Sequence, residues 1–227
     1  MANKRPPIIF LVYANDRVDP AKHLRNLVEE INNIRDALKV AEQEKLCEVL
    51  LEPNASVDRI FSIFQDSRYR DRIAVFHYAG HANSYQLLLE SSSGGNSAVD
   101  AAGLAAFLAQ QQALQLVFLN GCSTEQHAQK LLEASCAAVI ATSQAIDDEV
   151  AKDFASSFYR GLGGGASLEK ACHEAKAIIR AKKGDNLRKL YLGGATDVGI
   201  GSSSWDLRVK PGGELVRSWN LPDAVDN

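Results

Sequence analysis

A histidine and a cysteine stand where two apolar stretches of the sequence end. His81 closes the run IAVFHYAGH (73–81), and Cys122 follows the run LQLVFLNG (114–121). Such runs are typical of strands in a parallel sheet, whose ligands bind beyond the carboxyl ends of the strands. Because consecutive strands usually lie side by side, we expect the imidazole and the thiol to face each other across one crevice. The pair predicts a nucleophilic cysteine with a histidine as its general base.

The residues around this pair favour the same chemistry. Asn120-Gly121 predicts a sharp exit from the strand, and a predicted helix begins directly after Cys122, a position that favours a thiolate. The exit leaves the backbone N–H of Cys122 free to point into the crevice, and the N–H of Ala82 is a second candidate donor to an oxyanion. A nucleophile, a base and two donors together describe acyl transfer.

Other reactive side chains favour structural roles. Three cysteines lie among apolar residues and are interpreted as core residues: Cys47, Cys136 and Cys172. His77 and His81 have the spacing HxxxH, which suits a metal on a helix, but this run is a predicted strand, so no metal site is expected. The glycines of 161–165 match neither common nucleotide-binding loop, so no nucleotide is expected, and no other cofactor is expected either.

Hydrophobic periodicity predicts strands that alternate with helices. Continuous apolar runs predict strands at 8–14, 47–52, 72–81, 114–121 and 136–143, and a short strand followed by a turn at 85–97. Helical spacing predicts helices at 20–43, 57–64, 101–112, 148–161 and 167–182, and one after Cys122. Asn54 or Ser56 is the expected cap of the second helix. Strands joined by crossover helices predict a three-layer α/β fold, with a mainly parallel sheet flanked by helices on both faces.

The composition excludes several classes of function. The chain of 227 residues has a net charge of −3 at pH 7, so no basic surface for nucleic acid or an anionic membrane is expected. No apolar run reaches about 18 residues, and the stretch after the opening MANKRPP is too short for a signal peptide. Four scattered cysteines without a CxxC pair are typical of reduced thiols. These features predict a cytoplasmic protein.

The last part of the chain differs from the rest. Residues 193–204 are small and polar, and WDLRVKPGGELVRSW (205–219) alternates around Pro-Gly-Gly, which predicts a hairpin. The final NLPDAVDN shows no residues expected to form a core. We therefore expect a main domain over residues 1–200, and over 201–227 an appendage and linker towards a further domain.

Three stretches of the sequence together resemble a known family. AVFHYAGHA (74–82), LVFLNGCST (116–124) and a long segment that begins AAVIATSQAIDDEV (137–150) are similar to the CHAT domains, caspase-like cysteine peptidases of the clan that includes caspases and separases. In that family the histidine of the first stretch and the cysteine of the second form the catalytic dyad, which corresponds to His81 and Cys122. Ala82 stands where many members have glycine, and Gln144 where many have tryptophan.

The resemblance also implies a function and its partners. It implies a cysteine endopeptidase that cleaves a protein substrate, as a regulated effector of bacterial defence or programmed cell death controlled by a further domain or partner protein. A catalytically silent caspase-like module for assembly or signalling is the alternative, although such a relative would be expected to lose the histidine or the cysteine. A flavodoxin-like binding domain with incidental thiols would leave the placement of His81 and Cys122 unexplained.

The resemblance further implies a substrate pocket, lined by the loop after the first strand and by the residue two before the cysteine. The candidate residues are Asn15, Asp16 and Asn120, with Asp147 and Asp148 after the fifth strand adding negative charge. These positions hold no arginine, so we expect the pocket to disfavour an aspartate before the scissile bond. The alternative is that Asp16 and Asp148 only cap helices.

Overall fold

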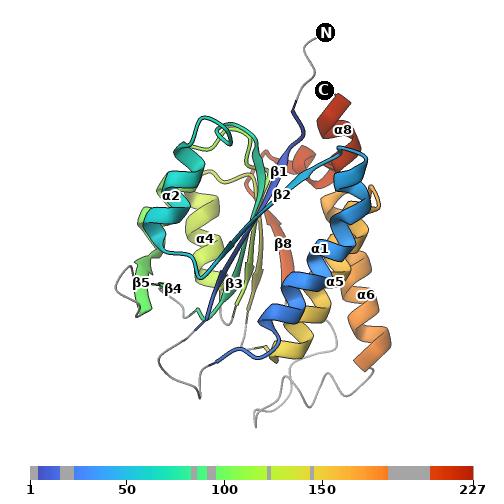
Figure 1. The fold of residues 1–227 in the computed structure, drawn as a ribbon, viewed down its shortest axis with the longest axis horizontal. Helices are drawn as coiled ribbons and strands as arrows, with labels where there is room; N and C mark the ends of the chain where they lie inside the picture. The colour runs from blue at the N-terminus through green and yellow to red at the C-terminus, as the bar shows by residue number, and fades with distance from the viewer. Residues whose placement is uncertain are drawn as a thin grey trace.

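A six-stranded sheet forms the middle layer of the protein. The computed structural model describes residues 5–15, 23–82, 86–90, 96–121, 124–143, 146–183 and 205–226. The strands lie in the order β2-β1-β3-β6-β7-β8, and all are parallel to their neighbours except β8, which runs antiparallel to β7. Their bounds are Ile8–Ala14 (β1), Glu48–Pro53 (β2), Ile73–Gly80 (β3), Leu116–Asn120 (β6), Ala138–Thr142 (β7) and Trp205–Val209 (β8). The carboxyl ends of the parallel strands meet at the lower edge of the sheet in Figure 1.

Helices cover both faces of this sheet (Figure 1). One face carries α1 (Leu27–Gln43), α5 (Asp148–Gly163) and α6 (Leu168–Lys183), and the other carries α2 (Val57–Gln65), α3 (Ala101–Leu108) and α4 (Glu125–Glu133). Each helix layer forms a separate hydrophobic cluster with the strand residues that face it. Every residue of β1 and β3 is buried because both faces of these strands are covered. The predicted three-layer α/β fold is confirmed.

The first helix begins later than its periodicity predicts. α1 starts at Leu27 rather than at residue 20, and the described residues 23–26 precede it as a loop and turn. The Asn15 amide bonds both backbone groups of Leu24, accepting from its N–H at 2.8 Å and donating to its carbonyl at 3.0 Å. The N–H of the cap residue Asn26 donates to Asp148 Oδ2 at 3.0 Å. These bonds hold the segment outside the helix, although Leu24 keeps the apolar spacing and packs against the core.

Two local features follow β2: the cap of α2, which is confirmed, and a small hairpin whose second strand the sequence does not predict. Ser56 caps α2 by accepting from the N–H of Arg59 at 3.3 Å. β4 (Gln86–Glu90) pairs antiparallel with β5 (Asn96–Asp100). The stretch NSAVD has weak strand character on its own, and its pairing with the predicted strand makes it extended. Asp100 then caps α3 through the N–H of Gly103 at 2.7 Å.

The predicted C-terminal hairpin is wrong. The alternating residues of β8 extend the main sheet instead, with Ile140 opposite Leu207 in an antiparallel pair with β7. A turn follows in which Gly212 has φ +76°, and the chain then forms a 3-10 helix, η3 (Glu214–Ser218), and a short helix, α8 (Leu221–Asp226). The expectation that the last residues cannot pack a core is also wrong, because Leu221 is fully buried in the α1, α5 and α6 cluster. The further domain expected beyond this segment stays a prediction.

Shortening Leu221 tests whether this C-terminal segment belongs to the core. Leu221→Ala should lower the free energy of unfolding by about 2–5 kcal/mol, the usual cost of emptying a buried leucine site. Leu215→Ala is the matched control, because Leu215 is 89% exposed and its loss should change stability by less than about 0.5 kcal/mol. Urea unfolding measures both, and equal midpoints for the two variants would contradict the packing of α8.

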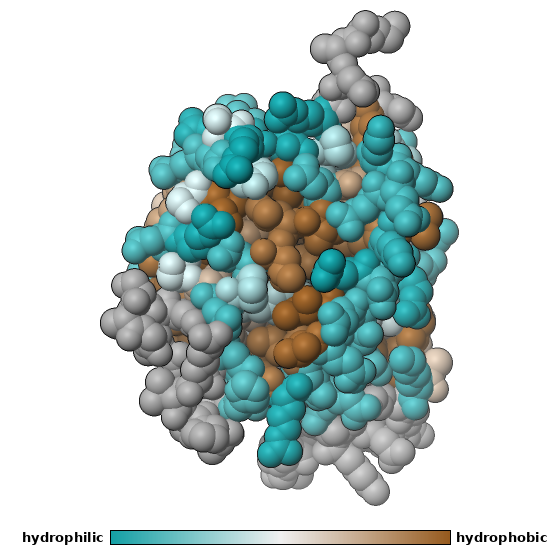
Figure 2. Space-filling view, viewed as in Figure 1, coloured by the Kyte–Doolittle hydropathy of each residue, from teal (hydrophilic) through white to brown (hydrophobic). Residues whose placement is uncertain are grey.

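The edge strand β2 carries the band of apolar side chains that Figure 2 shows along the middle of the visible face. Val49, Leu50 and Leu51 are partly exposed there. The N–H of Glu48 pairs with Pro7 of the neighbouring chain segment, so the N–H of Val49 points outward, where it donates to Glu42 Oε1 at 2.9 Å. This side-chain bond occupies one exposed edge group and so disfavours pairing with another chain.

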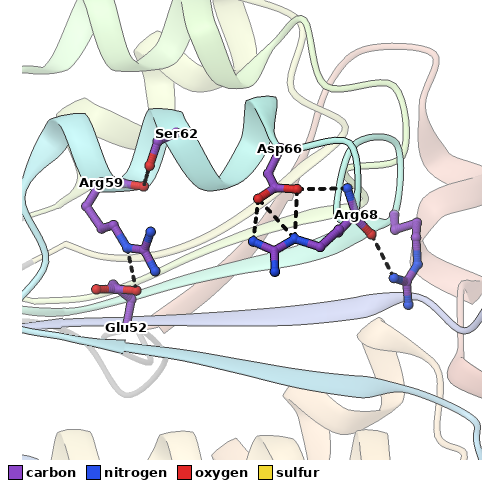
Figure 3. A network of polar contacts seen from close by, with 6 residues as sticks. Glu52, Arg59, Ser62, Asp66 and Arg68 are labelled. Atoms are coloured by element: carbon purple, nitrogen blue, oxygen red, sulfur yellow. Dashed lines mark hydrogen bonds and ion pairs between the residues drawn. The ribbon is translucent and has the colours of Figure 1, made fainter.

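Exposed ion pairs surround α2 (Figure 3). Arg59 Nε donates to Glu52 Oε2 on β2 at 2.9 Å, and Arg68 binds Asp66 through Nε and Nη2 at 3.0 and 2.6 Å. The hydrogen bonds from Arg68 lower the pKa of Asp66 to about 2. Because Asp66 and Arg68 precede β3, they lie at its amino end, away from the strand ends that carry the candidate site. Among the residues described, no helix is both long and apolar enough to cross a membrane.

Candidate active site

The strands β3 and β6, which precede the two predicted catalytic residues in the sequence, lie side by side. β3 and β6 are parallel neighbours, and Ala79 lies opposite Asn120 as the last pair between them. Counting two residues onward in each strand leads to His81 and to Cys122. Cys122 itself lies outside the described residues, and Gly121 before it is described. The strand adjacency that the sequence predicts is confirmed, and it brings His81 and Gly121 to the same edge of the sheet.

Two glycines let the ends of these strands approach closely. A Cβ at Gly121 would lie 2.7 Å from the carbonyl oxygen of Gly80 and 3.2 Å from Ala82 Cβ. A Cβ at Gly80 would lie 2.6 Å from the carbonyl oxygen of Ala14 and 2.7 Å from Tyr78 Oη. Side chains at either position would therefore force backbone atoms apart. The residue before Cys122 thus lies against the two residues that flank His81.

The backbone of His81 is fixed by Tyr78 and the β4–β5 hairpin. The Tyr78 hydroxyl lies 2.6 Å from the His81 carbonyl oxygen and 2.7 Å from that of Leu88, and the Leu88 N–H donates to the His81 carbonyl at 3.0 Å. Burial raises the pKa of Tyr78, so its hydroxyl stays a donor. His81 itself is half-buried, unlike the strand residues before it. The imidazole is therefore attached to a rigid backbone at the boundary between core and solvent.

Thr142 of β7 binds both Gly121, the last described residue before Cys122, and Thr124, the first described residue after it. Thr142 Oγ1 donates to the Gly121 carbonyl at 2.5 Å and lies 3.1 Å from Thr124 Oγ1. The Thr142 N–H also donates to Thr124 Oγ1 at 2.9 Å. Thr124 occupies the N-cap position of α4, but its side chain makes no capping bond, because its hydroxyl is used in this contact. Gly121 and Thr124 are thereby fixed to one strand on either side of Cys122.

A buried polar network lies beneath the end of β6, on the side of α1 and α5. Asn120 Nδ2 donates to Glu30 Oε1 of α1 at 2.9 Å and to the Ala151 carbonyl of α5 at 3.3 Å. Asn120 Oδ1 accepts from Trp205 Nε1 of β8 at 3.3 Å. Asn120, Glu30 and Trp205 are 5%, 2% and 2% exposed. The amide of Asn120 is engaged in the interior, and its predicted contact with a substrate side chain stays a prediction.

The other predicted pocket residues hold the loops at this edge of the sheet. Asn15 binds Leu24, as described above, and Asp147 caps α5 by accepting from the N–H groups of Glu149 and Val150 at 2.9 and 3.4 Å. Asp148, in the first turn of α5, accepts from the backbone N–H of Asn26 before α1. Asp16 lies outside the described residues. A substrate contact of any of these residues stays a prediction.

The three cysteines assigned to the core are buried. Burial raises the pKa of Cys47 to about 12 and the pKa values of Cys136 and Cys172 to about 11. His77 is fully buried in β3, with Nδ1 3.1 Å from the Tyr159 hydroxyl and Nε2 3.4 Å from Glu30 Oε1. In the part of the chain that the structure describes, no three histidine, cysteine or carboxylate side chains are grouped to hold a metal.

Several supporting residues could not be identified from sequence patterns. Tyr78 and Thr142 are read as ordinary strand residues, and Glu30 as a polar position on an amphipathic helix. The sequence signals that could have identified these residues are weak. Thr142 is a threonine that ends an apolar strand, and Glu30 lies four positions before Ile34, on the same helix face, which becomes buried. Each side chain acquires its role from a partner on another element.

The arrangement of strands and helices defines a caspase-like α/β protein. A secreted C11 cysteine protease from Bacteroides thetaiotaomicron is similar, with a TM-score of 0.64 and 11% identity over 92% of this chain and 68% of that chain. The Drosophila initiator caspase Dronc has a TM-score of 0.54 and 12% identity over 92% of this chain and 83% of that one. The Arg-specific cysteine proteinase gingipain R has a TM-score of 0.59 and 10% identity over 92% of this chain and 48% of that one. At these identities the likeness shows the fold alone.

The model of the CHAT domain family matches residues 2–210, and the chain belongs to this family. The match includes both strands that end at the candidate site and the whole of the C-terminal strand β8. No curated protein matches the sequence. The family resemblance inferred from the sequence is confirmed.

Proposed function

We propose that this CHAT domain is a cysteine endopeptidase in which His81 and Cys122 form the catalytic dyad. The observation that carries the proposal is the close contact of the ends of β3 and β6, where Gly121, the residue before Cys122, lies against Gly80 and Ala82 on either side of His81. The family and fold, which are those of cysteine peptidases, support the same class of reaction. The pair would act on a peptide bond of a protein substrate.

The mechanism uses each group at a stated step. His81 takes the proton of the Cys122 thiol, and the sulfur attacks the carbonyl carbon while the π electrons move to the oxygen. Collapse of this intermediate breaks the C–N bond, and the amine leaves with the proton held by His81. Water, deprotonated by His81, then attacks the thioester, which releases the acid and returns the thiol. No cofactor is required at any of these steps.

The N–H groups of Cys122 and Ala82 are the proposed donors to the oxyanion. Ala82 lies opposite Leu87 in an isolated antiparallel bridge, whose hydrogen bond runs from the Leu88 N–H to the His81 carbonyl. In an antiparallel pair of this kind the opposed residues do not exchange hydrogen bonds, so the Ala82 N–H points away from the hairpin. It is therefore available to an oxygen at the end of β3.

The biological setting is proposed from the family resemblance. We place the protein in the cytoplasm as a regulated effector of bacterial defence or programmed cell death. An open peptidase site in that compartment would be hazardous, so we expect low activity until a further domain or partner protein orders the site. The proposed partners are a protein substrate and this regulator, without nucleic acid or membrane.

Selective alkylation provides a first test of the nucleophile. At pH 8 the thiols of Cys47, Cys136 and Cys172, with pKa values of about 11 to 12, should be ionised to no more than about 0.1%. Iodoacetamide should therefore modify Cys122 first, and peptide mapping by mass spectrometry identifies the modified residue. In urea all four cysteines should react, which shows that every site can be detected. Modification of Cys122 no faster than of the three buried cysteines would contradict the proposal.

A further inference from the structure

The carboxylate of Glu30 is buried, and the proposed reaction does not use it. Glu30 is 2% exposed on the face of α1 that packs on the sheet, and its Oε1 accepts from Asn120 Nδ2 at 2.9 Å. Burying a carboxylate is costly unless its oxygens are bonded, and an apolar side chain would pack there at less cost. Its partner Asn120 is the last residue of β6, directly before Gly121-Cys122 in the sequence. Glu30 therefore binds the strand end that leads to the proposed nucleophile.

The amide of Asn120 is bonded from three elements that surround the end of β6. Glu30 of α1 and the Ala151 carbonyl of α5 accept from its Nδ2, and Trp205 of β8 donates to its Oδ1. The Trp205 indole is itself fixed, because it stacks on Phe154 with ring centres 4.4 Å apart and planes 8° apart. The donors and acceptors of this amide match its partners in only one orientation. The network therefore fixes the side chain and the backbone of Asn120.

The charge environment of Glu30 is closed to solvent. His77 Nε2 lies 3.4 Å from Glu30 Oε1, and the rings of Tyr13 and Tyr159 surround the His77 ring with centres 5.8 and 5.5 Å from it. Burial and then the charge of Glu30 raise the pKa values of Tyr13 and Tyr159. The Glu30 carboxylate thus raises the pKa values of tyrosines in the core beneath β3 and β6, the two strands that lead to the proposed dyad.

We propose that Asn120 is a positioning residue for Cys122, held in its orientation by Glu30 and Trp205. Through Asn120, α1 and the C-terminal strand β8 fix where β6 ends and therefore where the nucleophile stands relative to His81. The inference rests on the proposed function, because the group being positioned is the proposed nucleophile. In this proposal the side chain of Asn120 binds residues of the protein interior and does not contact the substrate.

The test compares two substitutions that keep the size of the side chain, Asn120→Asp and Glu30→Gln, with two that shorten or reduce it, Glu30→Ala and Trp205→Phe. Asn120→Asp replaces the donor by an oxygen that faces Glu30, and Glu30→Ala removes the acceptor, whereas Glu30→Gln keeps an acceptor of the same size. Trp205→Phe removes one N–H but retains a ring to stack on Phe154. The matched controls are Asp36→Asn, an exposed carboxylate on α1, and Trp219→Phe, the second tryptophan of the chain.

The first readout is the rate at which iodoacetamide modifies Cys122. Displacing a reactive group by about 1 Å can cost up to about 100-fold in rate, so Asn120→Asp and Glu30→Ala should slow modification at least about tenfold. Trp205→Phe should slow it several-fold. Glu30→Gln and the two controls should stay within about twofold of the unmodified sequence. A network that only stabilises the fold would lower the melting temperature without this order of rates.

The second readout does not depend on catalysis. Amide hydrogen exchange of the peptide 116–124 should accelerate in Glu30→Ala and Trp205→Phe, while that of the peptide 8–14 should not change. Unchanged exchange at 116–124 together with unchanged Cys122 modification would overturn the positioning role. If modification of Cys122 proves independent of His81, the proposed dyad fails, and the exchange data still decide whether Asn120 is held by Glu30 and Trp205.

Discussion

Replacing Cys122 with alanine should abolish cleavage of protein substrates while the fold stays intact. The variant removes the only group proposed to form the acyl intermediate, so the loss should equal the whole catalysed rate. His81→Ala should reduce the rate by at least about 100-fold, since general-base catalysis by a positioned side chain contributes about 100- to 10,000-fold. A fluorescent peptide library and denatured casein, each incubated with the purified protein and any activating partner, measure cleavage.

Thermal unfolding provides the control for these two variants. Both positions lie where strands end, and their loss should leave the melting temperature nearly unchanged. His173→Ala is a matched substitution, because His173 lies on the exposed face of α6. It should retain activity. Cleavage that survives in Cys122→Ala would exclude the proposed nucleophile, and equal activity of His81→Ala and His173→Ala would exclude the proposed base.

A methyl group at Gly121 should have the second largest effect. Its Cβ would lie 2.7 Å from the Gly80 carbonyl oxygen, and neither atom can rotate away, because the oxygen belongs to the backbone and the Cβ position is fixed by its own backbone. The ends of β3 and β6 would have to separate, which moves His81 relative to Cys122. We expect Gly121→Ala to slow Cys122 modification by about 100-fold and to destabilise the fold by about 1–3 kcal/mol.

Gly103→Ala is the matched control for this substitution. Gly103 lies in α3, and the nearest atom to an added Cβ is Asp100 Oδ2 at 3.5 Å, an ordinary contact. Alanine should therefore raise stability by about 0.5–1 kcal/mol through its better helix propensity and leave the reactivity of Cys122 unchanged. Similar effects of the two substitutions on Cys122 would show that the contact between Gly121 and Gly80 does not position the dyad.

The sequence was most informative where one element determines its own structure. The apolar runs of β1 and β3 predict buried strands because each residue in them needs cover on both faces. Ser56 is predictable as a helix cap, because its partner N–H is only three residues away. The placement of His81 and Gly121 at one sheet edge followed from the rule that consecutive strands are neighbours.

Features that depend on distant partners could not be predicted in this way. The start of α1 is set by Asp148, which lies far along the chain from Asn26, and Glu30 meets Asn120 ninety residues away. The alternation around Pro211-Gly212 is compatible with a hairpin, but β7 offered a free edge that the first half could join. Leu221 gives no local signal of burial, since the cluster that receives it forms only when the helices pack.

The role of β8 changes how the C-terminal segment relates to the site. Trp205 is the first residue of this strand, and its indole N–H donates to Asn120. The C-terminal segment therefore contacts the residue that lies two positions before Cys122 in the sequence. The Trp205→Phe variant tests whether this contact fixes the end of β6.

The alkylation rate of Cys122 with and without the imidazole of His81 tests the proposed dyad most directly. The native protein and His81→Ala are each treated with iodoacetamide at pH 7, and the reaction is quenched at a series of times. Quantitative peptide mapping then gives the rate constant for modification of Cys122. Cys47, Cys136 and Cys172 serve as internal references. The dyad predicts at least about a tenfold lower rate in His81→Ala, because the thiolate loses its neighbouring base. Equal rates in the two proteins would contradict it.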